Sequence, residues 1–111
     1  MAATFYIKQN DTAPSIQAVL TDSNGRVRSM VEGASVRFNM SKEDGTNVIS
    51  GGIGSFGIPL SKGIVEYVWE AGDTADAGIY NAEFEITYTS GQVETFPNNS
   101  YIKVIVKEEL A

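Results

Sequence analysis

The chain of 111 residues contains no histidine and no cysteine. Histidine is the commonest general base in enzymes and a frequent metal ligand, and ordinary zinc sites draw on both residue types. Their absence excludes ordinary zinc chemistry and the usual activation of a nucleophile. We therefore expect a protein that is not an enzyme and that uses neither a metal nor another cofactor. A fold without cysteine must also hold together without a disulfide.

Basic residues and long apolar runs are scarce as well. Eight Lys and Arg face 14 Asp and Glu, which gives a formal net charge of −6, and a field of that sign repels nucleic acid phosphates. No stretch approaches the ~18 apolar residues of a membrane span, and the first residues lack the basic and apolar regions of a signal peptide. We expect neither nucleic acid nor membrane partners, and synthesis and folding in a cytoplasm.

What the chain does contain is a series of short alternating segments separated by turn residues. Eleven glycines against three prolines suit many strands joined by tight turns. The length suits one domain over residues 1–111. The expected strands cover residues 5–8, 15–21, 26–30, 34–40, 48–49, 64–69, 79–89, 92–96 and 101–107.

One corner motif specifies the architecture. Asp76, Gly78 and Tyr80 form a D-x-G-x-Y pattern directly before the cleanest alternating segment in the chain. This pattern is typical of a tyrosine corner, in which a Tyr hydroxyl near the start of a strand bonds to backbone a few residues upstream. We expect a buried Tyr80 bonded to backbone within residues 73–76. The sequence thus predicts an all-β fold, a single immunoglobulin-like antiparallel β-sandwich with a tyrosine corner.

The only tryptophan has two readings. One interpretation is that Trp69 and Tyr67 form an aromatic platform for sugars, but both share one face of the expected strand with Val65. That face is the better core face, because it carries the large aromatic side chains. A core position for Trp69, beside Phe84, Phe38 and Val65, is the favoured prediction.

Two groups of carboxylates resemble functional motifs. Asp22 opens a D-S-N-G sequence like that of a calcium loop, but the twelfth position is Gly33 where an EF-hand needs Glu. A hairpin turn is the better interpretation. Glu83 and Glu85 lie on the polar face of one strand, and paired carboxylates can serve glycoside hydrolysis. A solvated or partner-facing stripe is favoured over a catalytic pair.

A glycine-rich segment is the strongest candidate for a contact surface. Residues 51–57 carry four glycines, so we expect a flexible or tightly bent loop that exposes Ile53 and Phe56. An exposed apolar pair on such a loop is a liability unless a partner covers it. With Phe5 and Ile7 of the N-terminal segment, these residues form the candidate interface. The alternative is that Ile53 and Phe56 fold back onto the sandwich.

Several blocks of the sequence resemble one viral protein family, the N-terminal domain of the phage baseplate upper protein. The resemblance spans about residues 4–106 in order and spacing. Its blocks are FYIKQNDTAPSI at 5–16, LTDSNG at 20–25, GASVRFNM at 33–40, VEYVWEAGDT at 65–74, AGIYNAEFEI at 77–86 and ETFPN at 94–98.

This resemblance implies a function that the residue pattern alone does not. It implies a bacteriophage virion structural protein that docks onto tail, baseplate or neck components through protein–protein contacts. Its partners would be other virion proteins, with homo-oligomers in a symmetric assembly, and its location the virion after synthesis in the host bacterial cytoplasm. Two alternatives are a capsid-surface decoration protein and a module that binds host-surface carbohydrate.

Overall fold

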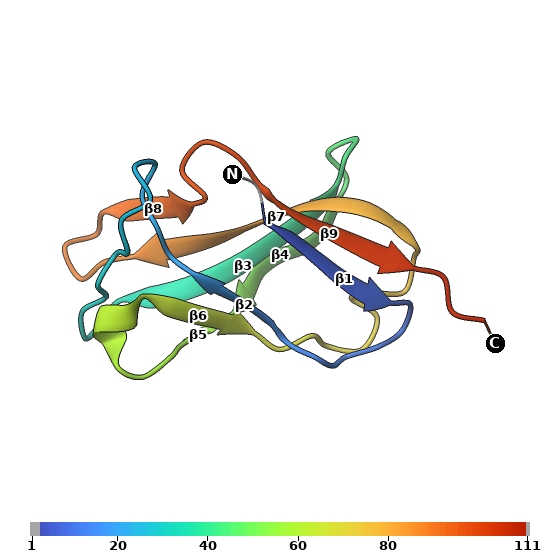
Figure 1. The fold of residues 1–111 in the computed structure, drawn as a ribbon, viewed down its shortest axis with the longest axis horizontal. Helices are drawn as coiled ribbons and strands as arrows, with labels where there is room; N and C mark the ends of the chain where they lie inside the picture. The colour runs from blue at the N-terminus through green and yellow to red at the C-terminus, as the bar shows by residue number, and fades with distance from the viewer. Residues whose placement is uncertain (1–2, 111) are drawn as a thin grey trace.

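The computed structural model describes residues 3–110, which form a sandwich of two β-sheets (Figure 1). The large sheet has the strand order β1-β9-β7-β3-β4, with β8 also paired to β7, and the small sheet has the order β2-β6-β5. The elements are β1 (Thr4–Lys8), β2 (Ile16–Val19), β3 (Ser35–Lys42), β4 (Asn47–Ile53), β5 (Ser55–Phe56), the 3₁₀ turn η1 (Leu60–Lys62), β6 (Ile64–Tyr67), β7 (Gly78–Thr87), β8 (Val93–Phe96) and β9 (Ile102–Lys107).

Strand β7 organises the large sheet. One of its edges pairs with β3 from Ser35↔Thr87 to Lys42↔Tyr80, and its other edge pairs first with β9 and then with β8. Its buried residues alternate with half-buried ones, as the sequence pattern predicted. The predicted sandwich is therefore present. Its pairing is not purely antiparallel, because β1 runs parallel to β9.

Some local expectations differ from the structure. The expected strand at 26–30 is reduced to one bridge between Thr21 and Val27. Strand β4 is longer than the expected segment 48–49 and runs to Ile53. Among the described residues, no helix has the length and apolarity to cross a membrane.

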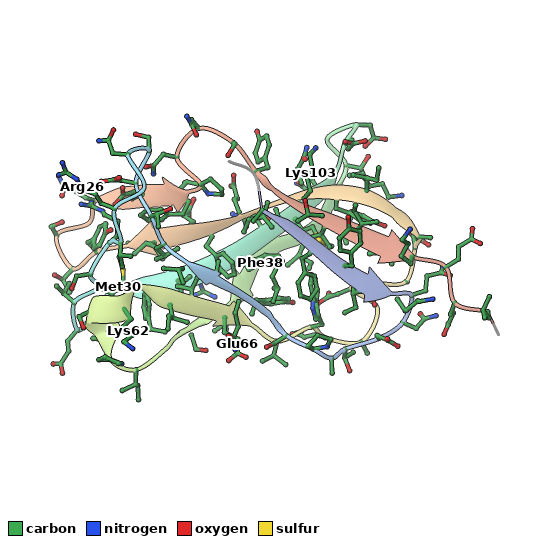
Figure 2. All side chains as sticks on the ribbon, in the orientation of Figure 1. Arg26, Met30, Phe38, Lys62, Glu66 and Lys103 are labelled. Carbon is green, nitrogen blue, oxygen red and sulfur yellow. The ribbon has the colours of Figure 1, made fainter. Side chains whose placement is uncertain are left out.

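Aromatic side chains join the two sheets at the centre of the core. Phe38 from the large sheet stacks on Tyr67 from the small sheet, with ring centroids 4.6 Å apart. Trp69 meets Phe38 edge-on at 5.7 Å and is 3% exposed. Figure 2 shows Phe38 in the middle of the molecule. Trp69 thus lies in the core rather than on a surface platform. Its indole Nε1 has no hydrogen-bond partner among the described residues.

The tyrosine corner is formed as the sequence predicted. Tyr80 is buried, and its hydroxyl donates a hydrogen bond to the Asp76 carbonyl oxygen. Asp76 therefore contributes its backbone, while Gly78 begins β7 at a position where a Cβ atom would lie 3.8 Å from Tyr80 Cε1. This hydrogen bond holds the loop before β7 against the first residues of β7.

A second set of hydrogen bonds ties the same loop to the end of β1. Thr74 is a buried polar residue, and its hydroxyl donates to the Asp11 carbonyl oxygen at 2.8 Å. In return, the backbone N–H of Asn10 donates to the Thr74 carbonyl oxygen at 3.0 Å. The Gln9 side-chain amide donates to the Ala75 carbonyl oxygen. The turn after β1 and the loop before β7 therefore support each other.

We predict that Tyr80→Phe lowers the free energy of unfolding by about 1–3 kcal/mol, because the Asp76 carbonyl oxygen loses its buried donor. Urea unfolding measures the change. Tyr6→Phe is the matched control, since Tyr6 is 61% exposed. Equal stability of the Tyr80→Phe variant and the wild type would contradict this role of the hydroxyl.

We predict that Trp69→Ala lowers the free energy of unfolding by about 3–5 kcal/mol, because the substitution leaves a cavity beside Phe38. Thermal and urea unfolding both test this. Tyr101→Ala removes a half-exposed aromatic ring and serves as the control. A Trp69→Ala variant with an unchanged melting temperature would show that the indole contributes nothing to the core.

Candidate functional site

One side of the sandwich is closed by a strand that changes sheets. The chain leaves the large sheet at the end of β4, passes Gly54, and joins the small sheet as β5. The Gly54 N–H donates to the Val36 carbonyl oxygen at 3.1 Å. A Cβ atom at Gly54 would lie 3.0 Å from the Glu66 carbonyl oxygen and 3.1 Å from Val36 Cγ1. A side chain at this position would force the crossing strand or its neighbours to shift, so glycine suits the close approach to both sheets.

The neighbouring glycines have similar structural reasons. Gly51 has a φ of +71°, and its N–H donates to the Asn39 side-chain oxygen at 2.7 Å. A Cβ atom at Gly52 would lie 2.7 Å from Tyr67 Cε1. The segment 51–57, expected to be a flexible or tightly bent loop, consists mostly of strand residues and bends at Gly54, where the chain changes sheets. The glycines allow a strand to pack tightly against the aromatic core.

The four candidate contact residues lie in different environments. Ile53 is 77% exposed, whereas Phe56 is partly buried against the core, which is the fold-back alternative for that residue. Phe5 is also partly buried, with its ring 5.9 Å from that of Trp69. Ile7 is 5% exposed and belongs to the core, so it is not available to a partner and that assignment is corrected.

Sequence reasoning missed two exposed apolar residues. Ile58, just after β5, is 92% exposed, and Tyr6, between the two inward-facing residues of β1, is 61% exposed. Strand alternation contained the signal for Tyr6, because neighbours of an inward residue face outward. No local pattern reveals the exposure of Ile58, which depends on where the loop turns.

The crossing strand belongs to a long segment without charge. No Asp, Glu, Lys or Arg occurs over residues 45–61, although a fifth of the whole chain is charged. This segment, called here the charge-free edge, covers β4, β5 and most of η1, and it carries both Ile53 and Ile58. Depletion of charge is typical of the central part of protein interfaces.

The turn that leads into the charge-free edge is held by its own polar groups. The Thr46 N–H donates to Asp44 Oδ1 at 2.9 Å, and this hydrogen bond lowers the pKa of the Asp44 carboxyl below its usual value. Glu43 forms an ion pair with Lys103 at 3.1 Å. The acidic groups before the edge therefore have partners within the chain.

The opposite side of the sandwich is open. A cleft of about 360 Å³ lies where the ends of β1 and β8 face β2. Its lining contains no charged side chain. The lining residues are Ala3, Thr4, Phe5, Ile16, Gln17, Ala18, Val19, Leu20, Thr21, Phe84, Phe96, Pro97 and Ile102.

The outer face of the large sheet carries a polar depression. Glu83 and Glu85 line it together with Asn39, Asn81 and Tyr101, among others. The Asn39 side-chain amide lies 3.4 Å from Glu83 Oε2 as a hydrogen-bond donor. Over residues 3–110, no group of three or more Asp and Glu side chains is arranged to hold a metal ion. The two glutamates thus form a half-buried polar stripe on the outer face of β7.

Comparisons with known proteins support the fold and not a family. Neither the protein-family models nor the curated proteins gave a match. A solved structure, that of CopC from Methylosinus trichosporium OB3b, is similar with a TM-score of 0.58 and 12% sequence identity. The match covers 99% of this chain and 89% of the CopC chain. At this identity the likeness shows the shared β-sandwich alone.

These comparisons correct the function that the resemblance implied. The similarity found is to CopC and not to a phage structural protein. This finding overturns the prediction of a bacteriophage virion protein, together with its capsid-decoration and host-glycan alternatives. The blocks that carried the resemblance have clear structural roles in the corner, the turn after β1 and the aromatic core.

We predict that Gly54→Ala lowers the free energy of unfolding by about 1–3 kcal/mol, the usual cost of overpacking. The added methyl group would press on the Glu66 carbonyl oxygen and on Val36. Ser50→Ala, at an exposed position of β4, is the control. Urea unfolding of both variants gives the comparison. An unaffected Gly54→Ala variant would mean that the crossing strand has room to shift.

Proposed function

We propose that this domain is a non-catalytic interaction domain and that its partner at the charge-free edge is a second copy of the same chain. The observation that carries the proposal is an uncharged segment along one side of the sandwich, residues 45–61, with two exposed isoleucines, Ile53 and Ile58. Large exposed apolar side chains that gather in one segment mark contact sites more often than scattered ones do.

Electrostatics favours this edge for self-association. Each copy carries a net charge of −6, so two copies repel each other overall. Residues 45–61 contribute no charge, and two copies can therefore meet there without like-charge contact between edge residues. Burying both isoleucines stabilises such a dimer through the hydrophobic effect, and the electrostatic repulsion that opposes it is smaller at this edge than elsewhere.

The geometry favours contacts through side chains rather than a long continuous sheet. Strand β4 is the last strand of the large sheet and pairs only with β3. Its register shifts twice along that pairing, between Phe38 and Met40 and between Met40 and Ser41. Bulges of this kind discourage strand pairing along a sheet edge. A two-fold arrangement with the isoleucines of each copy against the other is the simplest closed form.

We predict that the wild-type chain forms a dimer in a concentration-dependent way and that Ile53→Lys combined with Ile58→Lys weakens it at least tenfold. The two lysines would place like charges opposite each other across the two-fold axis and remove the apolar contact. Sedimentation equilibrium measures the dissociation constant. Val68→Lys is the matched control, because Val68 is 60% exposed but lies outside the charge-free edge.

Two results would overturn the proposal. The first is a wild-type chain that remains monomeric up to about 1 mM, the concentration that corresponds to a standard binding free energy near −4 kcal/mol. The second is an equal weakening by Val68→Lys, which would place the contact elsewhere. Circular dichroism of each variant shows whether the fold is retained.

A further inference from the structure

The open side of the sandwich presents a strand edge whose backbone is unpaired. Strand β2 is the last strand of the small sheet, and its one partner in the described part of the chain is β6. The Leu20 N–H donates to the Gly63 carbonyl oxygen at 2.7 Å, which fixes the phase of the antiparallel ladder. Because bonded and non-bonded pairs alternate, Gln17 and Val19 direct their N–H and C=O groups away from β6. Within residues 3–110, no hydrogen bond reaches these groups.

The cleft lies beside this edge and reaches the core. It has a volume of about 360 Å³ and is bordered by Thr4 at the start of β1 and Phe96 at the end of β8. Several of its lining side chains are almost inaccessible, among them Ile16 at 1% and Phe84 at 0% exposure. An occupant of the cleft would therefore touch the interior of the sandwich.

We propose that this side binds an extended segment of a partner protein, which adds to β2 as a further strand and places alternate apolar side chains in the cleft. Strand addition uses the main chain for affinity and pockets for alternate side chains for specificity. Here the unpaired backbone groups of Gln17 and Val19 would bind the main chain of the segment. The uncharged cleft would accept its alternate side chains. A small apolar molecule would leave the backbone groups unused.

The charges around the cleft indicate one feature of the partner segment. Thr21, which lines the cleft, bridges to Val27, so the hairpin that carries Arg26 stands at this end of the site (Figure 2). The other charged groups there have hydrogen-bond or ion-pair partners within the chain, and the Asp22 carboxylate, whose pKa is lowered chiefly by the backbone N–H of Arg26, keeps its negative charge. Asp22 Oδ1 accepts the backbone N–H groups of Asn24 and Arg26, and Arg28 forms an ion pair with Glu94 at 2.7 Å.

Arg26 is the cation at this end whose guanidinium is available to a partner, and it favours a carboxylate on the partner segment. Its guanidinium forms no ion pair within the described residues. The matching partner segment alternates apolar and polar residues and has a carboxylate beside the Arg26 end. This surface lies on the strand edge opposite the charge-free edge in both sheets, so the two contacts are independent.

The test uses synthetic peptides of about eight residues, the length of an ordinary strand, with Val at alternate positions and Asp at one end. A matched set has the register of the valines shifted or the Asp replaced by Lys. Amide NMR of the full chain measures binding and the exchange of individual N–H groups. We expect the Gln17 and Val19 N–H groups to become protected from exchange, and the Lys peptide to bind at least tenfold more weakly than the Asp peptide.

Val19→Pro removes one of these N–H groups without taking a hydrogen bond from the ladder to β6, and we expect it to weaken binding at least tenfold. Val93→Pro is the matched control, on the exposed position of another open strand, β8. If Val19→Pro unfolds the chain, wild-type chain with peptides N-methylated at alternate residues tests the same hydrogen bonds. Peptides methylated at the residues whose N–H groups face β2 should then lose binding. Peptides methylated at the intervening residues should still bind.

Three outcomes would overturn the proposal. One is the absence of binding by every peptide of the set at about 1 mM, a binding free energy near −4 kcal/mol. Another is unchanged affinity in the Val19→Pro variant, or with both patterns of N-methylation. The third is displacement of the peptides by benzene with no protection of the Gln17 and Val19 N–H groups, which would make the cleft a small-molecule pocket.

Discussion

The stacked pair of Phe38 and Tyr67 is the contact on which the sandwich depends. These rings join the large and small sheets at a centroid distance of 4.6 Å, and Trp69 and Phe84 close around Phe38. A chain without cysteine has no covalent link between its sheets, so packing alone must hold them. The Tyr67 ring also limits the neighbouring strand β4. The backbone of Gly52 lies so close to this ring that a side chain at position 52 would collide with it.

The two sheets are connected on one side of the sandwich and unconnected on the other, and each side carries one of the two proposed contacts. On one side the chain itself closes the gap, since β4 crosses through Gly54 into β5. On the other side β1 and β2 belong to different sheets and no strand of residues 3–110 joins them, which leaves the cleft. The segment that closes the first side, residues 45–61, is uncharged and its strand β4 is bulged, so it suits side-chain contact with a second copy. The open side has a free ladder and a cavity, so it suits an added strand.

The sequence blocks that resembled a phage family make contacts within the fold. Tyr80 bonds to the Asp76 backbone at the corner, and Thr74 is buried against the turn that contains Asp11. Residues with such roles indicate the fold of the chain. The same fold can serve many unrelated functions. This is the physical reason that a resemblance carried by corner, turn and core residues supported the fold and led to an incorrect function.

The sequence alone determined the alternating strands, the tyrosine corner and the core position of Trp69, because each depends on residues close together in the chain. It also determined the absence of histidine and cysteine chemistry. Tertiary structure decided what the glycines of residues 51–57 do, because their reason is the approach of Tyr67, Val36 and Glu66 from other strands. It likewise decided that Ile7 is buried while Ile58 is exposed, since exposure depends on which segments of the folded chain cover a residue.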